Sequence, residues 1–415
     1  MKKLLTQMCN EWRANMWLTL ELMIVSVVLW YCISTLFINY TVFSEPRGHD
    51  ISHVYRLRFS ATAEENELDA MQRADIKEEL RQRIIRRPEV EAAAYSYASL
   101  PYTFSNRSSQ LQDHDTVAPL YAFGALHKWV QPDFFRVFRV KGTRGESPER
   151  LAELLPAGHN VFGASEGLLC DSTYTQVNMV DQIGRKFILN GYPDHTLAAI
   201  TPRFKNLDFS ISDYGRCVWD MMVHPALWVA DELTVRVRAN MDDGSFAGKV
   251  MNDSESALRV GPYYICEVLD FDDIRANTQF EDMELMRNST IGIAFLLLNI
   301  FLGILGTFWF RTQQRINEIA ILKVCGATSA TIFRRLMAEG LIILLIATPL
   351  AIMADYYIAT SFELIKFHHS ESVYTDLSLC AGITLIVMAI IIVCGIYFPA
   401  RRAMAIEPAR ALCDE

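Results

Sequence analysis

Four long apolar segments interrupt a chain that is otherwise a mixture of polar and apolar positions. Residues 291–310 and 378–398 contain no charged side chain, while 17–38 and 340–362 each contain a single acidic residue. A helix of about 20 apolar residues is long enough to cross the hydrocarbon core of a bilayer. The pattern therefore predicts four transmembrane helices, and the two charge-free segments argue against helices buried in a soluble protein.

The segment before the first apolar run has a helical pattern of its own. Leucine, methionine and tryptophan recur at helical spacing within residues 1–16, with lysine and polar residues largely elsewhere. This favours an amphipathic helix lying on the inner leaflet, although an extension of the first span has the same pattern. The run at 17–38 is longer than the core of a signal peptide and no small-residue cleavage site follows it, so we expect it to stay uncleaved.

Lysine and arginine residues predict how the four helices cross the membrane. They are concentrated before the first span, in the connection at 311–339 and in the tail at 399–415, whereas the 363–377 loop is mainly acidic. Cytoplasmic loops carry an excess of basic residues. Both termini and the 311–339 connection are therefore expected in the cytoplasm, and the block at 41–289 outside it.

The block at 41–289 shows mixed signals of helix and strand. The expected fold class is therefore an α-helical membrane domain of four transmembrane helices, with an α/β (α+β) extracytoplasmic domain inserted between helices 1 and 2. A small second lobe is expected at about 165–230. Alternating or strongly apolar stretches predict strands at 51–60, 90–99, 187–190, 197–200, 233–238 and 263–269, and helical periodicity predicts helices at 68–87 and 131–140.

Charge is distributed as unevenly as hydrophobicity. Residues 41–289 hold 37 acidic and 27 basic side chains, a balance of −10, and the rest of the chain holds 11 and 12, a balance of +1. With a net charge of −9, the chain lacks the basic footprint of a nucleic-acid-binding protein. A hydrophobic fraction of 51% also excludes an intrinsically disordered chain.

Motifs for catalysis are mostly absent from the sequence. It contains no phosphate-binding loop, no H-E-x-x-H and no C-x-x-C. We therefore predict no catalytic, cofactor-binding or metal-ligating residues, and a membrane enzyme is not favoured. The outer cysteines Cys170, Cys217 and Cys266 allow one disulfide at most, and free thiols are the simpler expectation. Of the acids within spans, Glu21 is expected to reach the inner interface, and Asp355 faces either a partner subunit or water.

The connection at 311–339 is the segment that most suggests a partner. Gly326 is placed to end one helix, and Thr328 or Ser329 to cap the next. This predicts a rigid helical elbow that carries both charged and apolar side chains. Such an elbow can dock in a groove of a cytoplasmic partner, and a solvated connector helix is the alternative.

The same segment resembles the signature of FtsX-like permease domains, roughly R-R-x-E-I-G-I-L-R-A-L-G-A-T. The matching residues are Arg315, Glu318, Ile319, Ile321, Leu322, Lys323, Gly326, Ala327 and Thr328. The tail at 397–412 resembles the P-A-R-R-A-x-x-x-x-P-x-x-A-L ending of the family. Stretches at 130–142 and 182–202 resemble the MacB-type periplasmic core domain.

This resemblance implies a type VII ABC transporter permease of the bacterial inner membrane, similar to MacB and to the LolC and LolE subunits. Such a permease dimerises with a second copy or a paralogue and works with a separate LolD/MacB-like ATPase, which binds the ATP. The implied ATPase-coupling residues are Arg315, Glu318, Ile321, Leu322, Lys323, Gly326, Ala327 and Thr328. Among them, Glu318 and Lys323 are expected to supply polar contacts, and Ile321 and Leu322 an apolar anchor.

Mechanotransmission would then pass movement of the elbow to the periplasmic domain, and the permease would use this movement to export or extract a lipophilic or peptide-like substrate. Membrane lipid, a periplasmic adaptor and an outer-membrane channel are further partners that the resemblance implies. The alternative is an FtsX-like signalling scaffold, whose outer domain controls a periplasmic hydrolase or sensor without transport. The size of the block at 41–289 favours transport.

Overall fold

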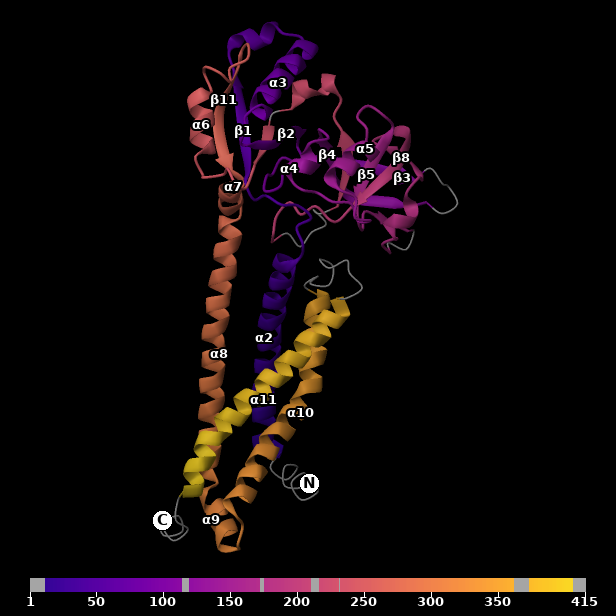
Figure 1. Cartoon of the computed structure of the whole chain (residues 1–415). Coiled ribbons are helices and arrows are strands. Elements are labelled where there is room, and N and C mark those ends of the chain that lie inside the picture. The colour runs from indigo at the N-terminus through magenta and orange to yellow at the C-terminus, as the bar shows by residue number, and fades with distance from the viewer. Residues whose placement is uncertain are drawn as a thin grey trace. The chain divides into compact units, whose positions relative to one another are not determined.

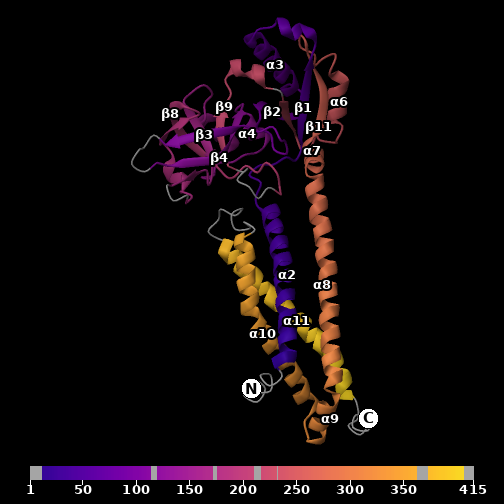
Figure 2. The ribbon, with the colours of Figure 1, turned by 180° about the vertical axis from the view of Figure 1, so that it is seen from behind.

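The computed structural model describes residues 12–113, 119–171, 175–209, 216–230, 232–361 and 373–405. The chain divides into two compact units, shown in Figures 1 and 2. The membrane unit comprises Met1–Thr41 and Glu284–Glu415, and the sheet unit comprises Val42–Met283. One long insertion therefore separates the first apolar helix from the other three, as the sequence predicts.

Four long helices make up most of the membrane unit. They are α2 (Trp12–Ser44), α8 (Phe280–Gln314), α10 (Ser329–Ser361) and α11 (Val373–Ala405). Each is long and apolar enough to cross a membrane, which confirms the four predicted spans. Of the amphipathic helix predicted for 1–16, the outer loop 363–377 and the tail 399–415, only 12–16, 373–377 and 399–405 are described, and all three continue long helices.

All four long helices contribute to one apolar interior. The buried side chains include Leu22, Leu29, Ile304, Ile343, Ala347, Met388 and Ile392. A polar contact crosses it, because the hydroxyl of Thr307 on α8 donates a hydrogen bond to the carboxylate of Glu21 on α2, at 3.1 Å. Asp355 on α10 is 5% exposed, so it does not reach water within the described part of the chain.

The sheet unit is built on an 11-stranded sheet that forms two lobes. The first lobe has the strand order β11-β1-β10-β2, and every neighbouring pair is antiparallel. Two βαβ units, β1-α3-β2 and β10-α6-β11, produce this ferredoxin-like order. Their bounds are β1 Val54–Ala61, α3 Ala70–Ile85, β2 Val90–Tyr97, β10 Glu232–Val237, α6 Phe246–Asp253 and β11 Tyr263–Asp270.

Local sequence explains most of the first lobe. Helix α3 begins at a capping box, in which the Asp69 carboxylate accepts the Gln72 N–H and the Gln72 side chain accepts the Asp69 N–H. Buried residues of α3 and α6 share one apolar core with the sheet, so both helices cover the same face. The strands and the helix predicted here at 51–60, 68–87, 90–99, 233–238 and 263–269 are all present.

The second lobe is a closed ring of strands inserted between β2 and β10. The order β4-β3-β7-β8-β5-β9 closes because β9 also pairs with β4, in parallel. The strands are β3 Ser108–Asp113, β4 Tyr121–Val130, β5 Val161–Ser165, β7 Lys186–Leu189, β8 Tyr192–Thr201 and β9 Cys217–Met221, with β6 Leu169–Cys170 beside β4. The ring has its own apolar core around Phe162 and Phe187.

The second lobe corrects one sequence expectation and agrees with another. The lobe predicted at about 165–230 begins earlier, at Ser108, because β3 and β4 pair with strands far along the chain. The strands predicted at 187–190 and 197–200 are present as parts of β7 and β8, which pair antiparallel. Short helices complete the unit: η1 Ala63–Glu67, α4 Phe134–Val137, α5 Pro148–Leu154, η2 Met179–Gln182, η3 His224–Val229 and α7 Phe271–Thr278. Helix α4 covers only part of the helix predicted at 131–140.

The three cysteines of the sheet unit are free thiols. Cys170 and Cys217 are buried and Cys266 is exposed. Burial raises the pKa of the Cys217 thiol to about 12. The thiol of Cys217 therefore stays protonated and packs as a small apolar group.

A buried carboxylate, Asp208, joins the two ends of the sheet unit. Its side chain is 1% exposed and lies 3.2 Å from Arg47 Nε and 2.7 Å from Arg275 Nη2. The hydroxyl of Tyr102 also donates to it, at 3.0 Å. Arg47 follows α2 directly and Arg275 lies on α7, just before α8. We call these four residues the clasp, because they bind the incoming and outgoing segments of the sheet unit to one side chain.

Backbone contacts hold the incoming segment beside the clasp. Gly48 has a φ of +74°, and a Cβ there would lie 2.0 Å from the carbonyl oxygen of Arg203. Only glycine allows both this conformation and this approach. The N–H of Lys205 then donates to the carbonyl of Arg47 at 2.9 Å, and the Lys205 ammonium donates to the carbonyl of Val42.

Replacing Asp208 by asparagine should destabilise the sheet unit by about 2 kcal/mol or more, because two arginines lose a buried counter-charge. The expected result is a lower thermal midpoint for the full chain in detergent, followed by circular dichroism. Asp194→Asn is the matched control, since its ion pair with Lys186 is more than half exposed on both sides and should be worth less than about 1 kcal/mol. Equal losses in the two variants would contradict the structural role of the clasp.

Candidate coupling site

The elbow predicted at 311–339 consists of the end of α8, the short helix α9 (Ile316–Val324) and the start of α10. Gly326 ends α9 with a φ of +89°. The N–H of Gly326 donates to the carbonyl of Lys323 at 2.9 Å, and that of Ala327 to the carbonyl of Leu322 at 3.0 Å. These two bonds form a Schellman motif, which satisfies the last carbonyls of α9 and requires a left-handed residue at Gly326.

Thr328 begins the next helix. Its hydroxyl oxygen accepts the N–H of Thr331 at 3.3 Å, and its carbonyl accepts the N–H of Ile332 at 3.1 Å. This is the N-cap arrangement. Of the two capping residues that the sequence leaves open, the structure selects Thr328. The chain therefore reverses between α9 and α10 over a turn in which each helix end is capped.

A small apolar core fixes the angle between the two helices of the elbow. Ile319 on α9 and Ile332 on α10 are 5% and 2% exposed and pack together. Leu322, Ala327 and Leu336 pack against them, and Leu322 and Ala327 occupy the two positions that commonly make the apolar contact of a Schellman motif. Leu322 thus belongs to the interior of the elbow.

Within the elbow, two ion pairs connect α9 and the residue before it to α10. Arg335 Nη2 lies 2.9 Å from Glu318 Oε1. Arg315 Nη1 lies 2.9 and 2.7 Å from the two carboxylate oxygens of Glu339. Glu339 is 8% exposed, so this second pair is largely withdrawn from water. Neither ion pair can be predicted from the sequence, because nothing local relates Arg315 to a carboxylate more than twenty residues later.

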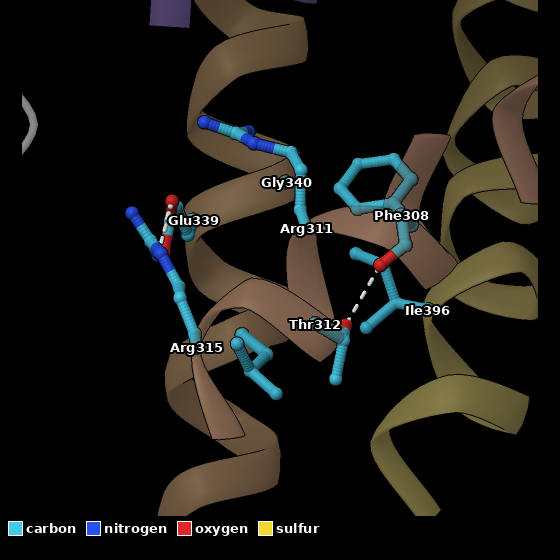
Figure 3. Close-up of a pocket in the computed structure, with 8 residues that line it drawn as sticks. Phe308, Arg311, Thr312, Arg315, Glu339, Gly340 and Ile396 are labelled. Carbon is cyan, nitrogen blue, oxygen red and sulfur yellow. Dashed lines mark hydrogen bonds and ion pairs between the residues drawn. The ribbon is translucent and has the colours of Figure 1, made fainter. Parts of the chain in front are cut away.

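The ion pair at Glu339 borders a small hollow between α8, α10 and α11. The hollow has a volume of about 20 Å³, enough for one water molecule. Figure 3 shows Arg315 and Glu339 facing each other on one side of it, with Phe308 and Ile396 on the other. Gly340 lies at the closest approach, since a Cβ there would be 2.6 Å from Ile396 Cδ1 and 3.0 Å from Ile392 Cγ2.

The outward face of the elbow carries exposed apolar side chains. Ile321 and Val324 are 53% and 67% exposed, and they lie three residues apart on α9. Gly326 and Thr328 are exposed at the turn, and Lys323 is half-buried. The predicted coupling residues therefore separate into an inner set, with Leu322 in the core and Arg315 and Glu318 in ion pairs, and an outer set around Ile321. Their role in binding an ATPase stays a prediction.

No group of three or more histidine, cysteine, aspartate or glutamate side chains is placed to hold a metal ion in the part of the chain that the structure describes. The arrangement at the elbow suits a mechanical contact: a stiff, capped turn with an apolar outer surface.

Comparison with known proteins finds a family similar to the C-terminal part of the chain. Residues 290–408 match the family described as FtsX-like permease C-terminal. No curated protein matches the chain. Among solved structures, the periplasmic region of MacB from Actinobacillus actinomycetemcomitans is similar at 8% identity and a TM-score of 0.32, covering 58% of this chain and 98% of that one.

Replacing Gly340 by leucine should force α8, α10 and α11 apart, because the added side chain has no space against Ile396 and Phe308. Overpacking of this kind costs about 1–3 kcal/mol, and we expect a clear fall in the thermal midpoint in detergent. Gly382→Leu on α11 is the control, since nothing lies within 4 Å of a Cβ there. A fall in midpoint for Gly382→Leu that matches Gly340→Leu would contradict the close packing at Gly340.

Proposed function

We propose, because residues 290–408 match the FtsX-like permease C-terminal family, that the chain is the membrane subunit of an ATP-driven transporter. In this proposal the ATPase is a separate protein that binds the elbow on the cytoplasmic side. One observation carries the proposal: Ile321 and Val324 are exposed on an elbow whose shape is fixed by its own core and ion pairs.

The exposed pair suits a protein partner. Apolar side chains surrounded by polar ones are typical of interaction sites, and a few such residues supply most of the binding energy. Lys323 and the exposed Arg334 lie near Ile321 and Val324 in the sequence and supply the polar rim. In this proposal the remaining predicted residues shape the elbow: Arg315, Glu318, Leu322, Gly326, Ala327 and Thr328.

Movement of a docked partner would pass into the helices. Arg315, at the junction of α8 and α9, is held to Glu339 on α10, so a displaced elbow moves α8 and α10 together. Helix α8 is preceded by α7, which carries Arg275 of the clasp. ATP binding to the partner would shift the elbow between two positions, and α8 would transmit this movement to the sheet unit.

The proposal also covers the orientation of the chain in the membrane, its partners and its substrate. In this proposal the elbow and both termini lie in the cytoplasm of a bacterium and the sheet unit lies on the outer side of its inner membrane, and the basic residues near the elbow and the termini support this orientation. Two permease subunits would work with the ATPase, which binds the ATP. The sheet unit would move a lipophilic or peptide-like substrate without passing it through a pore.

A double variant, Ile321→Asp with Val324→Asp, tests the docking site. Each change places a charge where an apolar contact is proposed and leaves the elbow core intact. We expect ATPase activity that co-purifies with tagged wild-type protein from its native host to fall about tenfold or more, since each interface residue contributes about 1–2 kcal/mol.

Met241→Asp with Met251→Asp is the matched control, because these methionines are 47% and 40% exposed on the sheet unit. It should retain the activity. If wild type co-purifies with no ATPase but keeps a partner on the sheet unit, the transporter proposal is wrong and a signalling scaffold is the better account.

A further inference from the structure

A second hollow, of about 440 Å³, lies inside the sheet unit where its two lobes meet. Its walls come from β2 and η3 on one side, and from β4, β9 and the loop before β5 on the other. Small-molecule sites usually measure about 300–1,000 Å³. The hollow is therefore the right size for a compact organic ligand.

Two aromatic and two sulfur-containing side chains contribute to the wall, Tyr97, Trp129, Met221 and Met222. The rings of Tyr97 and Trp129 lie 5.8 Å apart between centroids, at an angle of 50°. Met221 and Met222 are each 5% exposed, and Val229 adds an aliphatic surface. Faces of aromatic rings attract cations, and methionine adapts its shape to different apolar bodies.

The wall carries one formal charge among its described residues, the carboxylate of Asp220, and no lysine or arginine. Asp220 is about one third exposed, with a side-chain accessibility of 35%. In the parallel pair of β4 and β9 it is in register with Trp129, so the charge lies on the same face of the sheet as the indole ring. Negative charge next to aromatic faces is the combination that selects a cation with an apolar body.

Hydrogen bonds show that the neighbouring histidine leaves this charge in place. The N–H of Gln110 donates to Asn190 Oδ1 at 2.9 Å, which fixes the orientation of the Asn190 amide. Asn190 Nδ2 is then the donor to His127 Nδ1, at 2.9 Å, and His127 Nε2 is the donor to Asp220, at 3.2 Å. This network needs the neutral ring of His127, which therefore orients the Asp220 carboxylate without neutralising it.

Two cationic or aromatic neighbours limit where a ligand can bind. Arg107 lies 5.9 Å from the Tyr97 ring centroid and donates to the Tyr97 hydroxyl at 3.1 Å, so the Tyr97 ring already has a cation. His127 stacks on one face of Trp129, with 3.7 Å between centroids. The groups left for the ligand are the outer face of Trp129 and the Asp220 carboxylate.

We propose that this hollow binds a lipophilic cation, a molecule with an aromatic or aliphatic body and a basic or quaternary nitrogen or phosphorus centre. The body would lie against Trp129, Met221 and Met222, and the positive charge beside Asp220. Lipophilic cations would then be the substrate class of the proposed transporter. Transport of the cation rests on the proposed function, whereas binding of the cation in the hollow does not.

Tetraphenylphosphonium and tetraphenylborate test the proposal, because they have the same shape and opposite charge. Binding of each is measured by equilibrium dialysis with the full chain in phosphatidylcholine nanodiscs, without ATPase or nucleotide, after subtraction of binding to empty discs. We expect saturable binding of the cation alone. Since no ATPase is present, failure here is separate from failure of docking at Ile321.

Asp220→Asn should weaken binding of the cation about tenfold, while Glu153→Gln should leave it unchanged because Glu153 is exposed and does not line the hollow. Ala226→Phe fills the hollow without touching the carboxylate and should abolish binding, and thermal unfolding checks that all variants are folded. No saturable binding of the cation, equal binding of tetraphenylborate, or equal effects of Asp220→Asn and Glu153→Gln would each overturn the proposal.

Discussion

The structure of the sheet unit depends on keeping one buried carboxylate, Asp208, paired with two arginines. A buried charge without partners is costly, so Arg47 and Arg275 must both stay in place. These arginines belong to the segments by which the chain enters and leaves the unit. The clasp therefore makes one junction out of two connections that are more than two hundred residues apart, and a displacement at either connection is felt at the same side chain.

The elbow applies the same principle at the other end of α8. Four of its charged side chains form two ion pairs, Arg315 with Glu339 and Glu318 with Arg335, and these pairs set its shape. Its apolar side chains divide between a core and an exposed pair. A stiff elbow with an exposed apolar surface is suited to binding a partner and following its movement. Helix α8 connects the elbow to α7, which carries Arg275 of the clasp.

The hollow between the lobes completes this arrangement. It lies inside the sheet unit and is lined by the first lobe through β2 and η3 and by the closed ring through β4 and β9. A ligand there would contact both lobes at once, so its affinity would depend on how the lobes meet. A force transmitted along α8 that changed the arrangement of the two lobes would therefore change the affinity for the ligand.

The sequence by itself determined the features that neighbouring residues control. Hydropathy over about 20 residues defines a membrane helix, the Asp69 and Gln72 side chains cap α3, and Gly326 ends α9. Only the tertiary structure decided which distant segments meet. The parallel pairing of β4 with β9, the partners of Asp208, and the inward position of Leu322 against the outward one of Ile321 all depend on contacts between remote parts of the chain. Such contacts cannot be predicted from local sequence patterns. Many pairings between distant segments are compatible with the same periodicity, and the pairing that buries the apolar side chains is selected only when the chain folds.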